Sequence, residues 1–233
     1  MKKMILSALL LISAVIAQAQ NATETSEKSL WLTEFSEINA NGPFNIVFEQ
    51  IAETEAPRIV YDTKGSYTSK FRAEVKNSVL SISEKIESKR TTITTVKVYF
   101  HTLTNIKIIG AVASFNAPVV ATMLDMSIGG GAVMTAAFDI VDLNLEVSGK
   151  SGVTLTGLAR YLTLTASTSK VDATQLKVMS LYVDASNSAQ VMVYATERFD
   201  AKTSTGAKIT YMGNPAIIRG GASFTGGEIT KVD

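Results

Sequence analysis

The 233-residue chain contains no cysteine. It therefore has no disulfide bonds, no thiolate metal site, no cysteine nucleophile and no lipid-modified amino-terminal cysteine. Its single histidine, His101, does not build a typical zinc site without further histidine or cysteine ligands. No serine lies in a sequence that resembles the nucleophile elbow of a hydrolase, so we expect His101 at a strand end or on the surface. The sequence predicts no metal ion and no cofactor.

The chain also has almost no net charge, because its 22 lysines and arginines are balanced by 21 aspartates and glutamates. Nucleic-acid binding depends on clustered cations that neutralise phosphates, and no segment carries such a block. After residue 19 no apolar run is long enough to form a transmembrane helix. We therefore expect no nucleic-acid partner and no integral membrane span.

The amino terminus has the three parts of a secretory signal peptide. A basic start, Met1–Met4, precedes an apolar run from Ile5 to Ile16 and an Ala-Gln-Ala cleavage site. The apolar run is too short to span a bilayer. Residues 1–19 are thus predicted to be a signal peptide, and the protein is predicted to be exported to the periplasm, the cell surface or the medium. Residues 20–30 are polar and are expected to form a flexible leader.

Residues 31–100 alternate apolar and polar side chains in short runs, which is typical of β-strands with one buried face. This region carries more charge and more bulky aromatic side chains than the rest of the chain. No long amphipathic helix is visible outside the predicted signal peptide. We therefore expect an all-β chain that begins near Trp31 and in which residues 31–100 form a β-rich amino-terminal cap region.

Residues 101–233 repeat a short unit: an alternating apolar run, a turn of small residues, and then valine or isoleucine. A fixed period near 20 residues with strand-like content indicates stacked rungs. We predict a parallel β-helix, a solenoid with rungs of about 18–20 residues, that continues the cap as one structural unit over residues 31–233. The apolar residue after each turn recurs at steps of 20, 18, 20, 18 and 20, in the order Val133, Val153, Val171, Val191, Ile209 and Ile229.

Parallel stacking puts the same position of each rung into one column. The inward columns must be apolar, because one rung cannot bury its own inner face without a neighbour. The last rung lacks a neighbour on one side, and an exposed rung edge favours pairing with another chain. The sequence thus predicts a homodimer through the C-terminal rung. The predicted inward residues include Leu143, Leu145, Val153, Leu155, Leu162, Leu164, Val171, Leu181, Val183, Val191 and Val193.

Several segments together resemble one protein family. The run Glu37–Gln50 resembles its opening strand, and Val96–Phe100 with Leu103–Gly110 resembles its central strand and first glycine-rich turn. Turns such as Ser148-Gly149 match its repeats, and Tyr211–Pro215 matches its late Tyr-x-Gly-x-Pro signature. The chain is thus similar to the putative auto-transporter adhesin "head GIN" domain family, exported Bacteroidetes proteins of undetermined activity. The resemblance implies a right-handed parallel β-helix preceded by a β-rich amino-terminal portion.

Tyrosines and aspartates are the candidates for a functional surface. Sugar-binding surfaces use flat aromatic rings, and tyrosines on successive rungs would form a shallow ladder for an extended ligand if they face outward. The solenoid aspartates occupy different phases of the repeat, so we do not expect them to converge in one groove. The candidate ligand-facing residues are Tyr161, Tyr182, Tyr194 and Tyr211, and the aspartates are Asp125, Asp139, Asp142, Asp172, Asp184 and Asp200.

These features favour an exported, non-catalytic interaction protein of the adhesin type, which binds an extended glycan or an envelope or surface protein on one solenoid face. A carbohydrate-active enzyme on the same scaffold, a polysaccharide lyase or hydrolase, is one alternative. It would require at least two carboxylates with arginine or lysine in one groove. A structural component of the cell envelope is the other alternative, and it would show neither a pocket nor a polar cluster.

Overall fold

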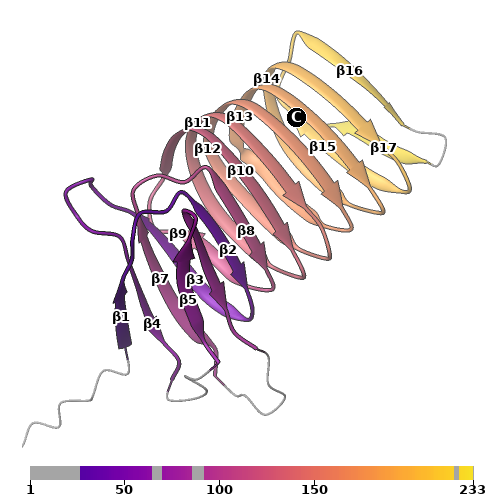
Figure 1. Cartoon of the computed structure of the whole chain (residues 1–233). Coiled ribbons are helices and arrows are strands. Elements are labelled where there is room, and N and C mark those ends of the chain that lie inside the picture. The colour runs from indigo at the N-terminus through magenta and orange to yellow at the C-terminus, as the bar shows by residue number, and fades with distance from the viewer. Residues whose placement is uncertain (1–26, 65–69, 86–91, 223–225, 233) are drawn as a thin grey trace, which may run out of the picture.

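The computed structural model describes residues 27–64, 70–85, 92–222 and 226–232. The predicted signal peptide lies outside these residues. Within them every regular element is a strand, and 17 strands join in one continuous sheet that winds into an elongated solenoid of about six turns, which confirms the predicted fold class (Figure 1). The strands are β1 (Glu27–Trp31), β2 (Glu37–Asn41), β3 (Phe44–Gln50), β4 (Arg58–Asp62), β5 (Arg72–Lys76), β6 (Val79–Ser83), β7 (Thr94–Phe100), β8 (Asn105–Ile109), β9 (Val112–Phe115), β10 (Val119–Gly129), β11 (Val133–Val147), β12 (Gly152–Ser167), β13 (Lys170–Ser186), β14 (Gln190–Thr203), β15 (Ala207–Met212), β16 (Ile217–Ala222) and β17 (Gly227–Lys231).

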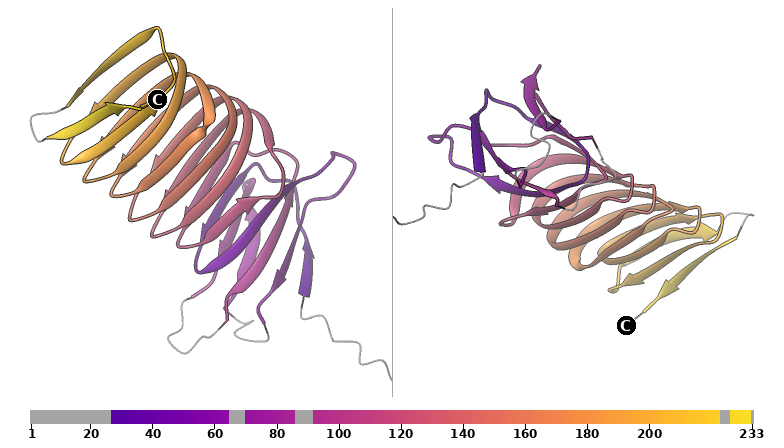
Figure 2. Two further views of the ribbon diagram at one scale, coloured as in Figure 1. Left: turned by 180° about the vertical axis from the view of Figure 1, so that it is seen from behind. Right: turned by 90° about the horizontal axis from the view of Figure 1, so that it is seen from below.

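The solenoid has two principal sheets. The first sheet stacks β6, β2 and β8, then the carboxyl-terminal parts of β10 to β14, and finally β16. The second sheet stacks β7, β3 and β9, then the amino-terminal parts of β11 to β14, and finally β15 and β17. The start of β10 and the middle parts of β11 to β14 form a third side. All these pairings are parallel, so equivalent positions of successive turns lie in columns (Figure 2).

The order of the first turns in space differs from their order in the chain. Strand β2 pairs in parallel with both β6 and β8, and β3 pairs in parallel with both β7 and β9. The turn made by β2 and β3 therefore lies between the turn made by β6 and β7 and the turn made by β8 and β9. Parallel stacking thus begins at Glu37, so the predicted boundary between a cap ending at residue 100 and a solenoid starting at 101 is wrong. The actual cap is made by β1, β4 and β5.

Antiparallel strands close the amino-terminal end of the stack. Strand β4 pairs with β7, β1 pairs with β4, and β5 pairs with β6, all antiparallel. The ring of Phe71 lies over the end of the core. It stacks on the Tyr61 ring, with centroids 4.2 Å apart, and meets the Phe44 ring edge-on, with centroids 6.0 Å apart. Residues 27–30 belong to β1, which corrects the prediction that they form a flexible leader.

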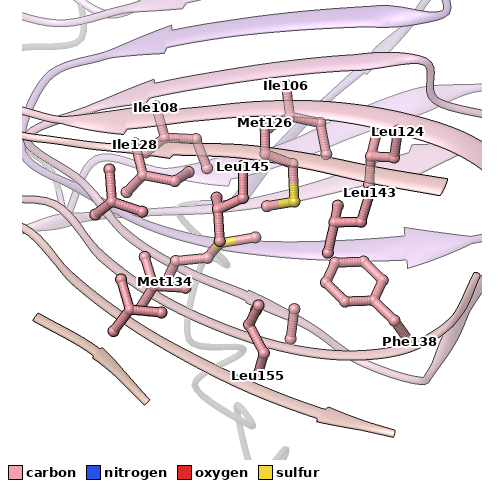
Figure 3. Packing of buried hydrophobic residues seen from close by; sticks show 14 of the residues in the cluster. Ile106, Ile108, Leu124, Met126, Ile128, Met134, Phe138, Leu143, Leu145 and Leu155 are labelled. Carbon is pink, nitrogen blue, oxygen red and sulfur yellow. The ribbon is translucent and has the colours of Figure 1, made fainter. Parts of the chain in front are cut away.

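The core is a set of apolar columns that run along the solenoid, and every predicted inward residue named above is buried. Figure 3 shows successive turns contributing side chains such as Ile106, Met126 and Leu145 to the same interior. The predicted repeat begins one residue too early. Val133 pairs with Gly152 and is 48% exposed, whereas the buried Met134 pairs with Val153. The true column is Met134, Val153, Val171, Val191, Ile209 and Ile229.

One glycine allows a long strand to bend between sides of the solenoid. Gly157 lies in the middle of β12, opposite Phe138 of β11, and has a φ of +104°. A Cβ at this position would lie 2.1 Å from the carbonyl oxygen of Phe138. Glycine is required here for two reasons, because side-chain-bearing residues rarely adopt this φ and because no space exists for a side chain.

Candidate functional site

The outward face of the first sheet is lined by two columns of polar side chains, which we call the polar face. They alternate with buried residues such as Ile106, Leu145 and Val183, so strand periodicity directs them outward. Because adjacent turns are about 4.8 Å apart, each column offers a polar side chain at that interval, except at Gly221. One column is Asn105, Asp125, Asn144, Thr163, Tyr182, Asp200 and Arg219, and the other is Lys107, Ser127, Glu146, Thr165, Asp184, Lys202 and Gly221.

The polar face contains two hollows. The first, of about 260 Å³, lies over β8, β10, β11 and β12 and includes Asp125, Asn144 and Glu146. In it the Asn144 side-chain amide donates a hydrogen bond of 2.7 Å to Oδ1 of Asp125. The second, of about 690 Å³, lies over β13, β14 and β16, and we call it the C-terminal groove. Its lining is Tyr182, Asp184, Asp200, Ala201, Lys202, Thr203, Ser204, Arg219, Gly220 and Gly221.

The C-terminal groove combines an aromatic ring with charges of both signs. Nζ of Lys202 lies 5.7 Å from the centroid of the Tyr182 ring, which is within range of a cation–π contact. Arg198 donates from Nε to Oδ2 of Asp200 at 2.9 Å and holds that carboxylate in place. The other oxygen, Oδ1, is buried and has no hydrogen-bond partner among the described residues.

The two aspartates of the groove are diagonal neighbours. Asp200 pairs with Tyr182, and Asp184, two residues further along β13, pairs with Lys202. Diagonal neighbours on adjacent strands have Cα atoms about 7–8 Å apart, so both carboxylates reach one small ligand. The prediction that the solenoid aspartates do not converge is therefore wrong for this pair. Lys202 and Arg219 were not predicted as site residues.

The predicted tyrosine ladder does not form, because the four tyrosines lie in different columns. Tyr182 lines the C-terminal groove. Tyr161 is 44% exposed on the turn before it, opposite Ser180 and diagonal to Tyr182. Tyr194 pairs with Lys177 and Met212 and lies outside the groove. Tyr211 is buried and stacks on Phe199 with ring centroids 4.4 Å apart, so it is a core residue and not a ligand-facing one.

A further hollow, of about 900 Å³, lies on the third side of the solenoid. It is lined by exposed apolar side chains, Val120, Val141 and Leu158, and by scattered charges including Arg160 and Glu197. No aromatic side chain lines it. This hollow therefore lacks the flat ring of the C-terminal groove, and its two carboxylates, Asp139 on β11 and Glu197 on β14, do not lie on adjacent strands.

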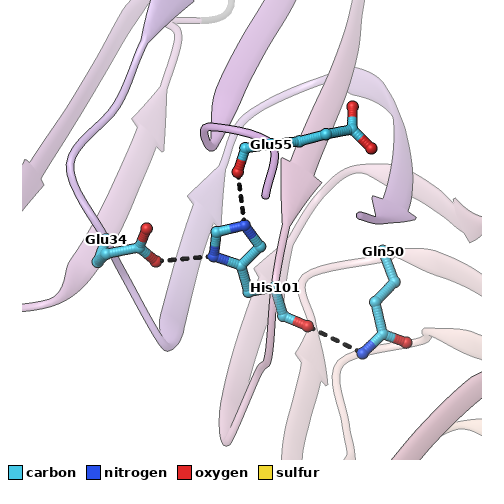
Figure 4. A network of polar contacts seen from close by, with 4 residues as sticks. All are labelled: Glu34, Gln50, Glu55 and His101. Atoms are coloured by element: carbon cyan, nitrogen blue, oxygen red, sulfur yellow. Dashed lines mark hydrogen bonds and ion pairs between the residues drawn. The ribbon is translucent and has the colours of Figure 1, made fainter. Parts of the chain in front are cut away.

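His101 connects the cap region to the solenoid through hydrogen bonds (Figure 4). It directly follows β7, as the strand-end prediction required. Its Nδ1 lies 3.0 Å from a carboxylate oxygen of Glu34, and its Nε2 lies 2.7 Å from the backbone carbonyl oxygen of Glu55. Both partners are acceptors, so only the protonated ring donates to both. The hydrogen bond to Glu34, and after it the one to Glu55, raise the pKa of His101 above its usual value.

The described residues contain no group of three or more histidines, aspartates or glutamates that could hold a metal ion. None of these residues forms a helix with the length and apolar character that crossing a membrane requires.

Comparison with solved structures supports the fold. A crystal structure of a putative adhesin from Bacteroides fragilis matches with a TM-score of 0.80 at 20% identity and covers 88% of this chain and 96% of that one. A putative adhesin from Parabacteroides merdae matches with a TM-score of 0.64 at 17% identity, covering 89% and 95%. A Parabacteroides distasonis structure named as a putative lipid binding protein matches with a TM-score of 0.65 at 17% identity, covering 89% and 96%.

The search of curated proteins gave no match. The family model described as "Putative auto-transporter adhesin, head GIN domain" matches residues 34–215, which is most of the chain. The name of this family implies an exported protein. The match spans β4 and β5 of the cap, the polar face up to β14 and the Tyr-x-Gly-x-Pro segment on which the sequence resemblance depended. The chain therefore belongs to the family of putative auto-transporter adhesins with a head GIN domain.

Proposed function

We propose that this protein is an exported, adhesin-like binding protein that holds an extended glycan on its polar face and one sugar ring in the C-terminal groove. The observation that carries the proposal is the content of that groove, where Tyr182 lies beside two carboxylates and two cationic side chains. Family membership supports an adhesin-type role but names no ligand.

The chemistry of the groove suits a sugar ring. A pyranose presents an apolar face, which packs on an aromatic ring, and adjacent hydroxyls, which both donate and accept hydrogen bonds. Tyr182 supplies the ring. Asp184 accepts from hydroxyls, while Lys202 and Arg219 donate to them.

The polar face also suits a chain of sugars more than a single one. The two hollows share the same two columns of side chains, one over the amino-terminal turns and one over the carboxyl-terminal turns. Thr163 and Thr165 of the first hollow pair with Tyr182 and Asp184 of the second, so the two hollows lie on adjacent turns. A ligand that extends along the solenoid axis therefore meets a hydrogen-bonding group on each turn that it crosses.

One observation favours a second function, cleavage of the bound glycan. The C-terminal groove holds two carboxylates with lysine and arginine, which is the minimum set expected for a carbohydrate-active enzyme. Against it, Oδ2 of Asp200 already accepts a hydrogen bond from Arg198 and Oδ1 is buried, which leaves Asp184 as the more accessible carboxylate of the pair. Binding without cleavage is therefore the function that we propose first.

The test is a glycan-array screen of the purified protein, followed by titration of the best ligand. Tyr182→Ala should weaken binding by about 30-fold, the equivalent of about 2 kcal/mol for an aromatic anchor. Tyr194→Ala is the matched control, since Tyr194 is also half-buried but lies outside the groove, and should leave binding unchanged. Equal effects of the two substitutions, or no glycan bound at all, would contradict the proposal.

Mass spectrometry of the bound glycan separates the two functions. Intact glycan after prolonged incubation supports binding alone. Shortened or unsaturated products that disappear in the Asp184→Asn variant, while binding persists, would instead establish an enzyme.

A further inference from the structure

The carboxyl-terminal end of the solenoid is open. Among the described residues, β16 pairs only with β14 and β17 only with β15, so the outer edge of each has unpaired backbone groups. Figures 1 and 2 show these two strands at the end opposite the cap. Edges of this kind are normally shielded by charges, proline, a bulge or a covering element, because they pair readily with other strands.

The core is uncovered at the same end. Ile218 continues the inward column of Leu181 and Phe199, yet 55% of its surface is exposed because no further turn of the described residues lies above it. Ile229 ends the inward column of Val191 and Ile209 and is only partly buried. A Cβ on Gly220 would lie 3.3 Å from Cδ1 of Ile229, so the inner sides of β16 and β17 meet across the end of the core.

The other end of the same solenoid indicates how such an end is closed. There, β4 and β5 add antiparallel strands to the last parallel ones, and Phe71 covers the core. The carboxyl-terminal end also has two edge strands and two incompletely buried isoleucines, Ile218 and Ile229. Among the described residues, no antiparallel strand and no aromatic side chain covers that end.

We propose that a second copy of this chain closes the open end, by antiparallel pairing of β16 and of β17 with the same strands of the partner about a two-fold axis. Directly opposed residues of antiparallel strands point to the same side of the sheet, so an inward residue must face an inward residue. The registers that place Ile218 and Ile229 opposite their own copies meet this condition.

The charges of the two edges fit this arrangement. In these registers Arg219 faces the partner's Ile217, and Glu228 faces the partner's Thr230. No two like charges are directly opposed, whereas a shift of one β16 strand by two residues relative to the other would place the two Arg219 side chains against each other. Because the amino-terminal end is already covered by the cap, the association stops at a dimer and does not extend into a fibre.

The experiment is light scattering after size-exclusion chromatography, together with sedimentation equilibrium, over a wide range of protein concentration. The protein should be a dimer that dissociates on dilution. Ile218→Lys should weaken association by about 100-fold or more, because two ammonium groups would then be buried against each other. Val120→Lys is the matched control, since Val120 is 66% exposed on the third side, and it should leave the dimer intact.

A mixing experiment tests the register and guards against simple misfolding. The Ile218→Lys and Ile218→Asp proteins should each be monomeric with the circular dichroism spectrum of the parent. Their equimolar mixture should form dimers, because each lysine then faces an aspartate. A parent protein that stays monomeric at all concentrations, or an Ile218→Lys protein that dimerises as tightly as the parent, would overturn the proposal. Assemblies larger than a dimer would overturn the closure about a two-fold axis.

Discussion

Gly157→Ala is the substitution that tests most directly why the long strands bend. The glycine has a φ of +104°, and an added Cβ would lie 2.1 Å from the carbonyl oxygen of Phe138, a separation that real Cβ atoms essentially never show. The unfavourable φ costs about 1–3 kcal/mol, and the local shift needed to relieve the clash costs about 1–3 kcal/mol more. We expect a loss of about 2–6 kcal/mol in the free energy of unfolding.

Two other glycines separate the two contributions. Gly131 has a φ of +78° but nothing within 4 Å of an added Cβ, so Gly131→Ala tests backbone strain alone. Gly152 has no unusual φ and nothing within 4 Å of an added Cβ, so Gly152→Ala is the control that lacks both backbone strain and a clash. Strain alone predicts a loss of about 1–2 kcal/mol for Gly131→Ala, and Gly152→Ala should be neutral or slightly stabilising.

The assay is urea unfolding followed by circular dichroism, with thermal unfolding as a second measure. For a chain of this length each kcal/mol lowers the midpoint temperature by about 2–4 °C, so Gly157→Ala should lower it by roughly 4–24 °C. The order of the three losses, with Gly157 largest and Gly152 smallest, is the decisive result. Equal losses for Gly157→Ala and Gly131→Ala would refute the argument that the Phe138 carbonyl leaves no room for a side chain.

Two further predictions concern the cap and the core. His101→Gln should reduce stability mainly in acid. The folded-state pKa of His101 is raised, so its contribution is fully present below its ordinary pKa of about 6.5 and is lost as the pH rises through the folded value. The difference in midpoint temperature between the two proteins should therefore shrink with rising pH. A constant difference would show that the protonated His101 ring does not stabilise the fold through Glu34 and Glu55. Leu145→Ala in the buried column should cost about 2–5 kcal/mol in urea unfolding, while Leu158→Ala on the exposed third side should cost under about 1 kcal/mol.

The repeat was the part of the fold that sequence predicted best. Alternation placed residues such as Leu145 and Val183 inward, because strand side chains alternate between faces and the same alternation returns on every turn. Only the start of the pattern was misplaced, at Val133, where Met134 fills the column. An error of one residue reverses a side chain from core to solvent, so Val133 is exposed.

The insertion of β2 and β3 between later turns was not predictable in this way. Pairing of Glu37 with both Val79 and Asn105 joins residues far apart in the chain, and no local pattern encodes such partners. The cap boundary was therefore placed by composition, which changes near residue 100, whereas the pairing does not change there.

The sequence alone did not predict the C-terminal groove, because strand register decides which residues of successive turns share a column. Tyr182, Asp200 and Arg219 follow one another at steps of 18 and 19 residues, the lengths of single turns, and so share a column. Their charges carry no periodic signal, since polar positions vary freely from turn to turn. The register shows that each of the two aspartates is followed, one turn later, by a cation. Lys202 pairs with Asp184, and Arg219 pairs with Asp200.

The two proposals meet at β16, which supplies Gly220 and Gly221 to the groove and the outer edge to the dimer. A two-fold axis normal to the first sheet leaves both polar faces on the same side, with two C-terminal grooves close to the centre of the dimer. Two linked sites gain avidity of about 100- to 10,000-fold on a surface that carries many copies of a ligand. The dimer should therefore bind a glycan-coated surface far more tightly than the Ile218→Lys monomer, while both bind a short soluble oligosaccharide equally. Equal binding of the coated surface by both proteins would show that the two grooves do not act on one surface together.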